Sequence, residues 1–443
     1  MTVDSGARLD RLPISRFHRR IMLLIGTGMF FDGFDIYVAA TVLGATLKSG
    51  FSTMVQNAQF MSLTFVGMML GSFLTGFLGD RYGRRFTYQA NLAIFGLASI
   101  ASAFAPSMSV LTLLRFIMGF GLGAENVVGY STMTEFVPPQ ARGKWLGIVN
   151  IFVVSGLPVA ALLGTLIIPL FTWRAMFALG GIGALVIWYL RKALPESPRW
   201  LESVGRAAEA EALLESIERE VSLQRGPLPP LLAKPSAAVS RSLRTLLSPT
   251  LLPRMVVGIT TMIVLNTLVF GFVTWLPTFF VQEGLSIVTS FSYSFVMALG
   301  APVGSTVAAL TADAWGRKPT IVGASILTIL IGGVYPYMHQ PAALLTAGFL
   351  LTVPMYVLVA VPVAIYVPEL FPTEVRLRAS GICNTFGRGA TILTPFLTVA
   401  LFRSYGIRGV VGMIIGFLLV QIVVVLRFGI EPKKRRLEEM DSV

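Results

Sequence analysis

Long apolar runs constrain what this chain can fold into more than any other feature of the sequence. Runs of about 20 residues, the length of a membrane-crossing helix, recur along almost the whole chain. Only 13% of the 443 residues are charged, against roughly 25% in soluble domains. We therefore expect an all-α membrane protein whose 12 transmembrane helices begin near residues 21, 58, 87, 109, 145, 175, 251, 290, 320, 342, 379 and 408.

The positions of the basic residues predict the orientation, because lysine and arginine concentrate in cytoplasmic connections. With both termini cytoplasmic, the external connections hold only Lys48, Arg174, Arg403 and Arg408, and only two further arginines fall inside the membrane. Every other basic residue is expected on the cytoplasmic side. The net charge of +13 then reflects topology rather than a nucleic-acid surface, since these residues are scattered over short loops.

The two halves of the chain repeat at an offset of 233 to 234 residues, which indicates an internal duplication. Two loops match: Asp80, Gly83, Arg84 and Arg85 against Asp313, Gly316, Arg317 and Lys318, and Glu135, Pro138, Arg142 and Gly147 against Glu369, Pro372, Arg376 and Gly381. The duplication predicts two pseudo-symmetric six-helix bundles.

Five regions follow from this pattern. We expect a cytoplasmic N-terminal segment (1–20), an N-terminal bundle (21–193), a cytoplasmic linker (194–250), a C-terminal bundle (251–428) and a cytoplasmic tail of basic and acidic residues (429–443). Within the linker, Ala207 to Val221 has the pattern of a short amphipathic surface helix, with Leu213, Leu214 and Ile217 on its apolar side. The segment 226–235, GPLPPLLAKP, is typical of a stiff linker.

Four motifs resemble signatures of the major facilitator superfamily: GFLGDRYGRR (76–85), RFIMGFGLG (115–123), PESPRWLESVGR (195–206) and VPELFPTEVR (367–376). They are similar to the branch that contains sugar porters, aromatic-acid:proton symporters, nicotinate and synaptic-vesicle-type transporters, and organic-ion transporters. This resemblance implies two bundles around a central cavity that work by alternating access.

The acids and bases of the cytoplasmic loops could pair and release as a gate, because guanidinium and carboxylate groups form bidentate pairs. The alternative is that the basic members only anchor the topology. The predicted gate comprises Asp80, Arg81, Arg84, Arg85, Glu135, Arg142, Asp313, Arg317, Lys318, Glu369 and Arg376.

Ionisable residues at membrane depth are functional candidates because burying them there is costly. The sequence contains five: Asp32, Asp35, Arg115, Glu125 and Arg388. Counted along their helices, Asp35 is closer than Asp32 to the depth of Arg115 and is its better partner, whereas Asp32 lies closer to Glu125. Clustered carboxylates titrate together, so these groups are candidates for proton coupling. The alternative for Asp35 and Arg115 is an ion pair that only joins two helices.

The motifs that contain the two aspartates resemble helix-one motifs of known transporters. GFD (33–35) looks like the helix-one motif of proton-coupled sugar porters, whose aspartate faces an arginine matched here by Arg115. DGFD (32–35) looks like the helix-one signature of aromatic-acid:proton symporters, in which both acids matter for transport.

A substrate carboxylate would suit Arg388, because its fork donates two parallel hydrogen bonds and keeps its charge. Organic-anion transporters look similar at this position. The alternative is that Arg388 caps backbone or pairs within the protein. The region near 262–280 lacks the paired glutamines of sugar porters, so a sugar substrate is not expected. Further candidate substrate contacts are Asn266, Tyr37, Phe34, Tyr130, Trp275 and Tyr356.

Together these features predict a proton-coupled symporter in the cell inner membrane that imports a small organic acid, with aromatic or cyclic carboxylates as one candidate class. It would act as a monomer in membrane lipid, without cofactor, metal or nucleic acid. The alternatives are a uniporter or antiporter of a neutral or cationic metabolite, and a transporter-like receptor. An enzyme is not expected, because no phosphate-binding loop or nucleophile with a nearby histidine was found.

Overall fold

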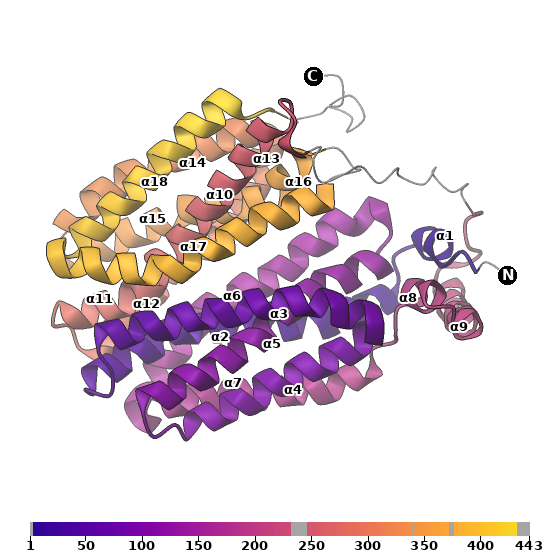
Figure 1. Cartoon of the computed structure of the whole chain (residues 1–443), viewed down its shortest axis with the longest axis horizontal. Helices are drawn as coiled ribbons and strands as arrows, with labels where there is room; N and C mark the ends of the chain where they lie inside the picture. The colour runs from indigo at the N-terminus through magenta and orange to yellow at the C-terminus, as the bar shows by residue number, and fades with distance from the viewer. Residues whose placement is uncertain (1–2, 232–245, 339, 372–375, 432–443) are drawn as a thin grey trace. The chain divides into compact units, whose positions relative to one another are not determined.

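The computed structural model describes residues 3–231, 246–338, 340–371 and 376–431, and these ranges are helical (Figure 1). The first half contains α2 (Arg16–Lys48), α3 (Met54–Tyr82), α4 (Arg84–Ala103), α5 (Met108–Phe136), α6 (Pro139–Phe171) and α7 (Arg174–Leu190), which a short turn, η1 (Arg191–Ala193), extends. Three short helices lie before α2 and after η1: α1 (Ser5–Asp10), α8 (Pro198–Ser203) and α9 (Ala207–Arg225).

The second half follows the same order with more interruptions. It contains α10 (Leu252–Gly271), η3 (Val273–Trp275), α11 (Leu276–Gln282), α12 (Ile287–Ala298), α13 (Gly300–Ala314), α14 (Arg317–Val334), η4 (Tyr335–Tyr337), α15 (Pro341–Val361), η5 (Pro362–Tyr366), α16 (Val367–Glu369), α17 (Arg376–Tyr405) and α18 (Ile407–Phe428).

Within the described ranges, 11 helical segments are long and apolar enough to cross a membrane. The last of them, α18, is apolar on all sides: Leu418 and Val425 are buried, while Leu419 and Val423 are more than half exposed. Such a helix suits lipid rather than water. The segment expected near residue 87 is α4, which is not among the 11 because its first turns are polar. A total of twelve spanning helices therefore stays a prediction.

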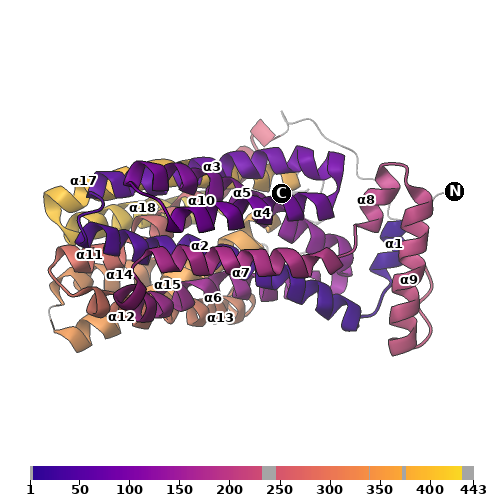
Figure 2. The same ribbon diagram turned by 90° about the horizontal axis from the view of Figure 1, so that it is seen from below.

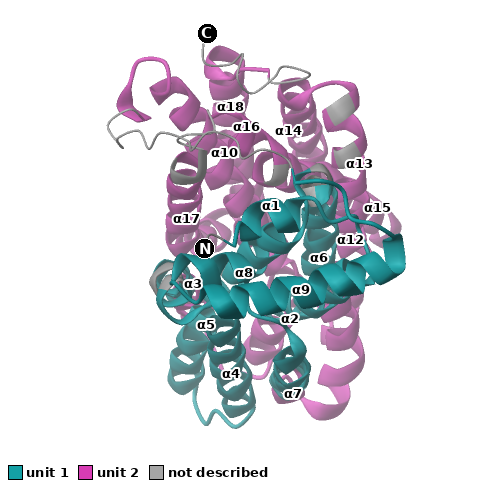
Figure 3. Ribbon diagram, turned by 90° about the vertical axis from the view of Figure 1, so that its right-hand side faces the viewer, with its two compact units in different colours: residues 1–36, 66–156, 177–236 teal, residues 37–65, 157–176, 237–443 magenta. Residues whose placement is uncertain are grey.

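Contacts divide the chain into two units, coloured teal and magenta in Figure 3. Unit 1 comprises residues 1–36, 66–156 and 177–236, and unit 2 comprises residues 37–65, 157–176 and 237–443. Within unit 1, small residues allow close helix crossings, as is common in membranes. A Cβ on Gly33 of α2 would overlap the carbonyl of Val153 on α6, and one on Gly156 would overlap the backbone of Phe34.

The helices α1, α8 and α9 lie side by side in unit 1 (Figures 1 and 2). The amphipathic pattern from Ala207 onward forms α9, which buries Leu214 and Ile217 and continues to Arg225. Residues 226–231 of the expected stiff linker follow it, and residues 232–235 lie outside the described ranges.

Charged groups fasten α1 to α9. Arg8 donates to Glu211 over 2.6 Å and to Glu218 over 2.7 Å, and Arg11 donates to Glu218 over 2.6 Å. Burial acts to raise the pKa of Glu218, but the bonds from the two arginines outweigh it, so this pKa lies below its ordinary value. The N-terminal segment is thus held in place by a carboxylate that must be ionised.

Acid should therefore release α1. A lowered carboxyl pKa stabilises the docked state above the ordinary value near 4.3 and loses that contribution as the pH falls through the folded pKa. We expect hydrogen exchange of the Ser5–Asp10 amides, corrected for intrinsic rates, to speed up several-fold below about pH 4. Glu218→Gln should show fast exchange already at pH 7. Glu215→Gln, an exposed change on the same helix, should not; equal exchange in both variants would contradict this account.

Candidate functional site

Four charged side chains predicted at membrane depth are buried inside unit 1. Asp32 and Asp35 on α2, and Arg115 and Glu125 on α5, are each only 1% exposed. Charges removed from water this fully need partners, because an unpaired buried charge is strongly destabilising. The partners that the structure provides therefore decide what each group can do.

Asp35 is paired with Arg115. The guanidinium Nη1 donates to the Asp35 carboxylate, and Nη2 donates to the Asp35 backbone carbonyl over 2.9 Å. The structure thus brings together Arg115 and the aspartate that the sequence favours as its partner. The pair satisfies one aspartate and joins α2 to α5 within unit 1.

Glu125 is paired with Arg191, which the sequence reasoning had counted among the cytoplasmic basic residues. Arg191, in η1, is fully buried rather than at the surface, and its Nη1 donates to Glu125. Its Nε and Nη2 also donate to the α2 carbonyls of Leu24 and Ile25, over 2.8 and 2.9 Å. An arginine directly after an apolar run usually lies at the membrane surface, which is why it was overlooked.

Two neighbours form the space that Arg191 occupies. Gly28 on α2 is required there, because a Cβ at this position would overlap the guanidinium. On α4, the ring of Tyr88 lies 4.7 Å from the Arg191 guanidinium carbon, a cation–π distance. A buried tyrosine and a glycine one turn before Asp32 are the signals that could have pointed to this site.

Asp32 is different from the other buried acids. Neither of its carboxylate oxygens has a hydrogen-bond partner among the described residues. Its charged neighbours are Glu125, Arg191 and Asp35. Asp32 therefore lies beside the Glu125–Arg191 pair without being bonded to it.

In unit 2, Arg388 lies in α17 and is partly buried. Within the described ranges its side chain makes no hydrogen bond or ion pair, and the Thr391 hydroxyl donates to its backbone carbonyl. Neither alternative, capping of backbone or pairing with an acid, is thus seen among these residues. The guanidinium keeps its full donor capacity for another group.

Asn266 on α10 lies next to this part of α17. A Cβ on Gly387 would come within 2.8 Å of the Asn266 amide nitrogen, so the absence of a side chain there admits the amide. That nitrogen donates to the Met262 carbonyl over 2.7 Å. The structure therefore places one predicted polar contact beside the residue that precedes Arg388.

Tyr37 and Tyr356 meet in unit 2, with their hydroxyl groups 3.1 Å apart. Tyr37 also lines a small cavity, together with Thr41, Pro277, Ser294, Met297 and Thr352. The lining combines aromatic and aliphatic surface with a few hydroxyl groups, which is typical of small-molecule sites.

The remaining aromatic candidates are less suited to ligand contact. Trp275 is 1% exposed and stacks on Phe279. Phe34 is buried against Phe30 and Phe31, and Tyr130 is half-buried with its hydroxyl 3.4 Å from Asn150. In this structure these side chains pack within their own units.

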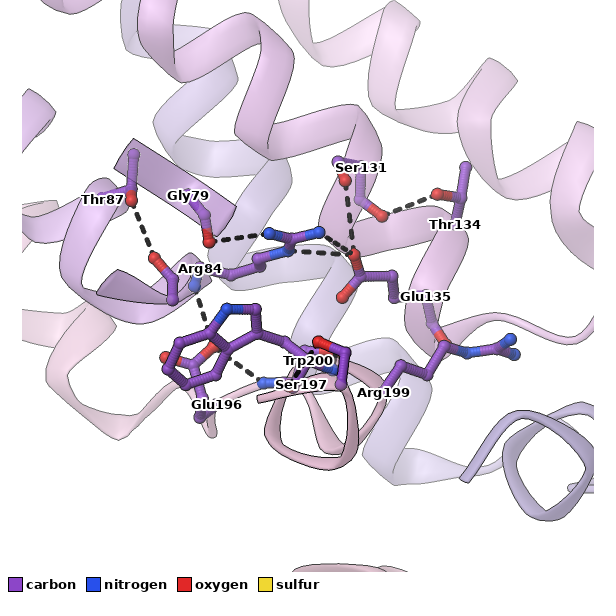
Figure 4. Close-up of polar contacts among 12 residues, drawn as sticks. Gly79, Arg84, Thr87, Ser131, Thr134, Glu135, Glu196, Ser197, Arg199 and Trp200 are labelled. Carbon is purple, nitrogen blue, oxygen red and sulfur yellow. Dashed lines mark hydrogen bonds and ion pairs between the residues drawn. The ribbon is translucent and has the colours of Figure 1, made fainter. Parts of the chain in front are cut away.

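The predicted gate forms a network at the loop between α3 and α4 (Figure 4). Arg84 donates to Glu135 over 3.0 Å and to the Gly79 carbonyl over 2.7 Å. Arg317 repeats this pattern in unit 2, with bonds of 2.9 and 3.2 Å to Glu369. Arginine and glutamate thus pair between the two repeated loops of each half.

Glu196, missed from the sequence, completes the network in unit 1. Its carboxylate accepts the backbone N–H of Arg84 over 2.9 Å, at the positive end of the α4 dipole (Figure 4). Burial raises its pKa despite these bonds. Gly83 makes the contact possible: its φ is 92°, and a Cβ there would overlap the Glu196 carboxylate.

The second half repeats this arrangement with Glu431. Its carboxylate accepts the N–H groups of Arg317 and Lys318 at the start of α14, over 3.0 and 2.8 Å. Gly316 has a φ of 108°, matching Gly83. Glu196 and Glu431 both follow the last helix of a half, and this shared position is the signal that could have found them.

The other predicted gate residues contribute less. Arg81 is exposed over the Tyr82 ring, Arg85 donates to the Lys192 carbonyl over 2.8 Å, and the Lys318 amine donates to the Leu426 carbonyl over 2.9 Å. The side chains of Asp80, Arg142, Asp313 and Arg376 lie outside the described residues. Among the residues described, no group of three acidic, histidine or cysteine side chains could hold a metal ion.

Comparison with known proteins agrees with this picture. The family described as "Sugar (and other) transporter" matches residues 21–443. The inner membrane metabolite transport protein YdjE of Escherichia coli (strain K12) is 38% identical, over 99% of this chain and 98% of its own. The niacin transporter NiaP of Acinetobacter baylyi is 30% identical, over 99% of this chain and 100% of its own.

Among solved structures, the partially occluded inward open conformation of the xylose transporter XylE from E. coli has a similar fold. It aligns with a TM-score of 0.73 over 95% of this chain and 100% of that chain, at 18% identity. The chain therefore belongs to the sugar (and other) transporter family of the major facilitator superfamily, and it is a multi-pass transporter of the inner membrane rather than an enzyme.

Proposed function

We propose that the protein is a proton-coupled symporter that imports a small organic acid. The observation that carries this proposal is the partly buried guanidinium of Arg388, whose side chain has no partner among the described residues. A cation at membrane depth is costly without a counter-charge. A substrate carboxylate would supply that charge and match the arginine fork.

The substrate named for one relative supports a carboxylate as the substrate of this protein. The name of the Acinetobacter baylyi protein assigns it niacin, which is a pyridine carboxylic acid. Aromatic or cyclic carboxylates of this size are therefore the candidate substrates. Asn266, beside Gly387, and the hydroxyl pair of Tyr37 and Tyr356 are candidate contacts for the rest of the molecule.

The buried acids of unit 1 suggest how protons take part. In this proposal an external proton loads Asp35 or Asp32, which weakens the hold of Arg115, and the substrate anion binds Arg388. Proton and anion together add no net charge, so the loaded protein crosses between its states more readily than with either alone. Transport of one proton with one monovalent anion would be electroneutral.

The same proposal assigns the rest of the chain. Twelve spanning helices with both termini in the cytoplasm would form bundles 21–193 and 251–428, joined by the linker 194–250, and a monomer in lipid would suffice. The loop networks around Glu135 and Glu369 would act as cytoplasmic gates that close in one state and open in the other.

A proton gradient should drive uptake. In proteoliposomes that contain the purified protein, an inward gradient of one pH unit should sustain about tenfold accumulation of labelled nicotinate or benzoate, because one pH unit equals a tenfold ratio in a one-to-one symport. Protein-free liposomes measure passive diffusion of the acids. Protein-dependent uptake that is equal with and without the gradient would remove proton coupling.

Loss of the Arg388 charge should remove acid binding. We expect Arg388→Ala to lose the thermal stabilisation by nicotinate or benzoate and to raise KM at least tenfold, since hydrogen bonds to a charged group contribute about 1.5–3 kcal/mol. Arg388→Lys should retain part of the thermal stabilisation. Arg403→Ala, an exposed change on the same helix, serves as the control. Stabilisation that persists in Arg388→Ala would exclude this residue from the site.

A further inference from the structure

The buried charges of unit 1 do not balance. Among its described residues, the Asp, Glu and Arg side chains exposed by 1% or less are Asp32, Asp35, Glu125, Arg115 and Arg191. Three carboxylates thus share two guanidinium groups, which leaves one negative charge uncompensated. A buried charge without a partner is strongly unfavourable, so one carboxylate of this set must hold a proton.

The hydrogen bonds identify that carboxylate. Asp35 accepts a hydrogen bond from Arg115, and Glu125 accepts one from Arg191 on one oxygen. The second Glu125 oxygen has no partner among the described side chains. Among the residues that the structure describes, no donor forms a hydrogen bond with either oxygen of Asp32. In this arrangement the proton belongs on Asp32, and the ionised pairs are Asp35–Arg115 and Glu125–Arg191.

Arg191 is held where it can serve both remaining acids. The Arg191 guanidinium donates to the Leu24 and Ile25 carbonyls and occupies the space beside Gly28. Asp32 follows Gly28 by four residues, so the guanidinium lies along the face of α2 that carries Asp32. The guanidinium and Glu125 are both electrostatic neighbours of Asp32. Two carboxylates therefore compete for one cation.

We infer that Arg191 is a positioning residue shared by Asp32 and Glu125, and that these two acids, rather than the Asp35–Arg115 pair, carry the coupled proton. When the O–H bond of Asp32 breaks and one forms on Glu125, Arg191 moves from Glu125 to Asp32. Each state has one neutral acid and one ion pair, so no charge is left unpaired.

The groups that face this triad come from every neighbouring element. Asp35 and its partner Arg115 supply a balanced pair from α2 and α5, and Tyr88 of α4 supplies a ring beside the guanidinium. Since the pair is already balanced and the tyrosine is neutral at ordinary pH, the proton count of the site is set by Asp32 and Glu125.

The inference rests on the proposed proton symport, and the test separates the two. Full-length protein in proteoliposomes is assayed with labelled nicotinate for gradient-driven accumulation and for the pH profile of counterflow without a gradient. In the wild type, one pH unit should give about tenfold accumulation. Asp32→Asn should lower the ratio to about one and flatten the counterflow profile.

Arg191→Gln leaves two acids without their cation, so its counterflow profile should shift to higher pH and its accumulation should fall; Arg191→Lys should restore part of both. The double variant Glu125→Gln with Arg191→Gln has no unpaired charge, which keeps the test valid if Arg191→Gln does not fold. It should also lack gradient-driven accumulation. Lys192→Gln, the exposed neighbour in η1, should match the wild type.

The accumulation of nicotinate by the wild type and by the variants distinguishes failure of the symport from failure of the proton assignment. If the wild type shows no gradient-driven accumulation, the proposed symport fails and the proton assignment fails with it. If the wild type accumulates nicotinate and Asp32→Asn or the neutral double variant does so equally, with an unchanged pH profile, the symport stands and the assignment to Asp32, Glu125 and Arg191 is overturned.

Discussion

Compensation of buried charge is the constraint on which the rest of the structure depends. In a chain made mostly of apolar helices, every ionised group away from water needs a counter-charge or a proton. Asp35 and Glu125 each accept a hydrogen bond from an arginine, and Asp32 accepts none within the described part of the chain. The helices α2, α4, α5 and η1 are held in mutual register by these contacts, so any change in protonation is also a change in helix packing.

The same rule acts at the starts of α4 and α14, where the charges are on the backbone. The first N–H groups of α4 and α14 have no partner inside their helices. Glu196 and Glu431 supply carboxylates to them, and Gly83 and Gly316 give those carboxylates room. Each loop network therefore joins a helix start, a helix end and the segment that follows the last helix of its half.

The sequence was sufficient for the all-helical fold and the family, because length, apolar content and the loop motifs are local signals. It was also sufficient for the Asp35–Arg115 contact, because depth along two straight helices can be counted. It was not sufficient for Arg191, since the path of a side chain from a helix end back into the protein depends on Gly28 and Tyr88 in other helices. The aromatic candidates Phe34 and Trp275 show the same difficulty: composition does not tell a packed ring from one that faces a ligand.

Glu431 lies just after α18 and accepts the N–H groups at the start of α14. The segment after η1 and the segment after α18 each contribute a glutamate to an equivalent helix start. The two segments therefore have the same structural role in the two halves. The first residues past the last membrane helix are part of the scaffold, and a chain cut directly after Phe428 would leave the N-terminus of α14 without its counter-charge.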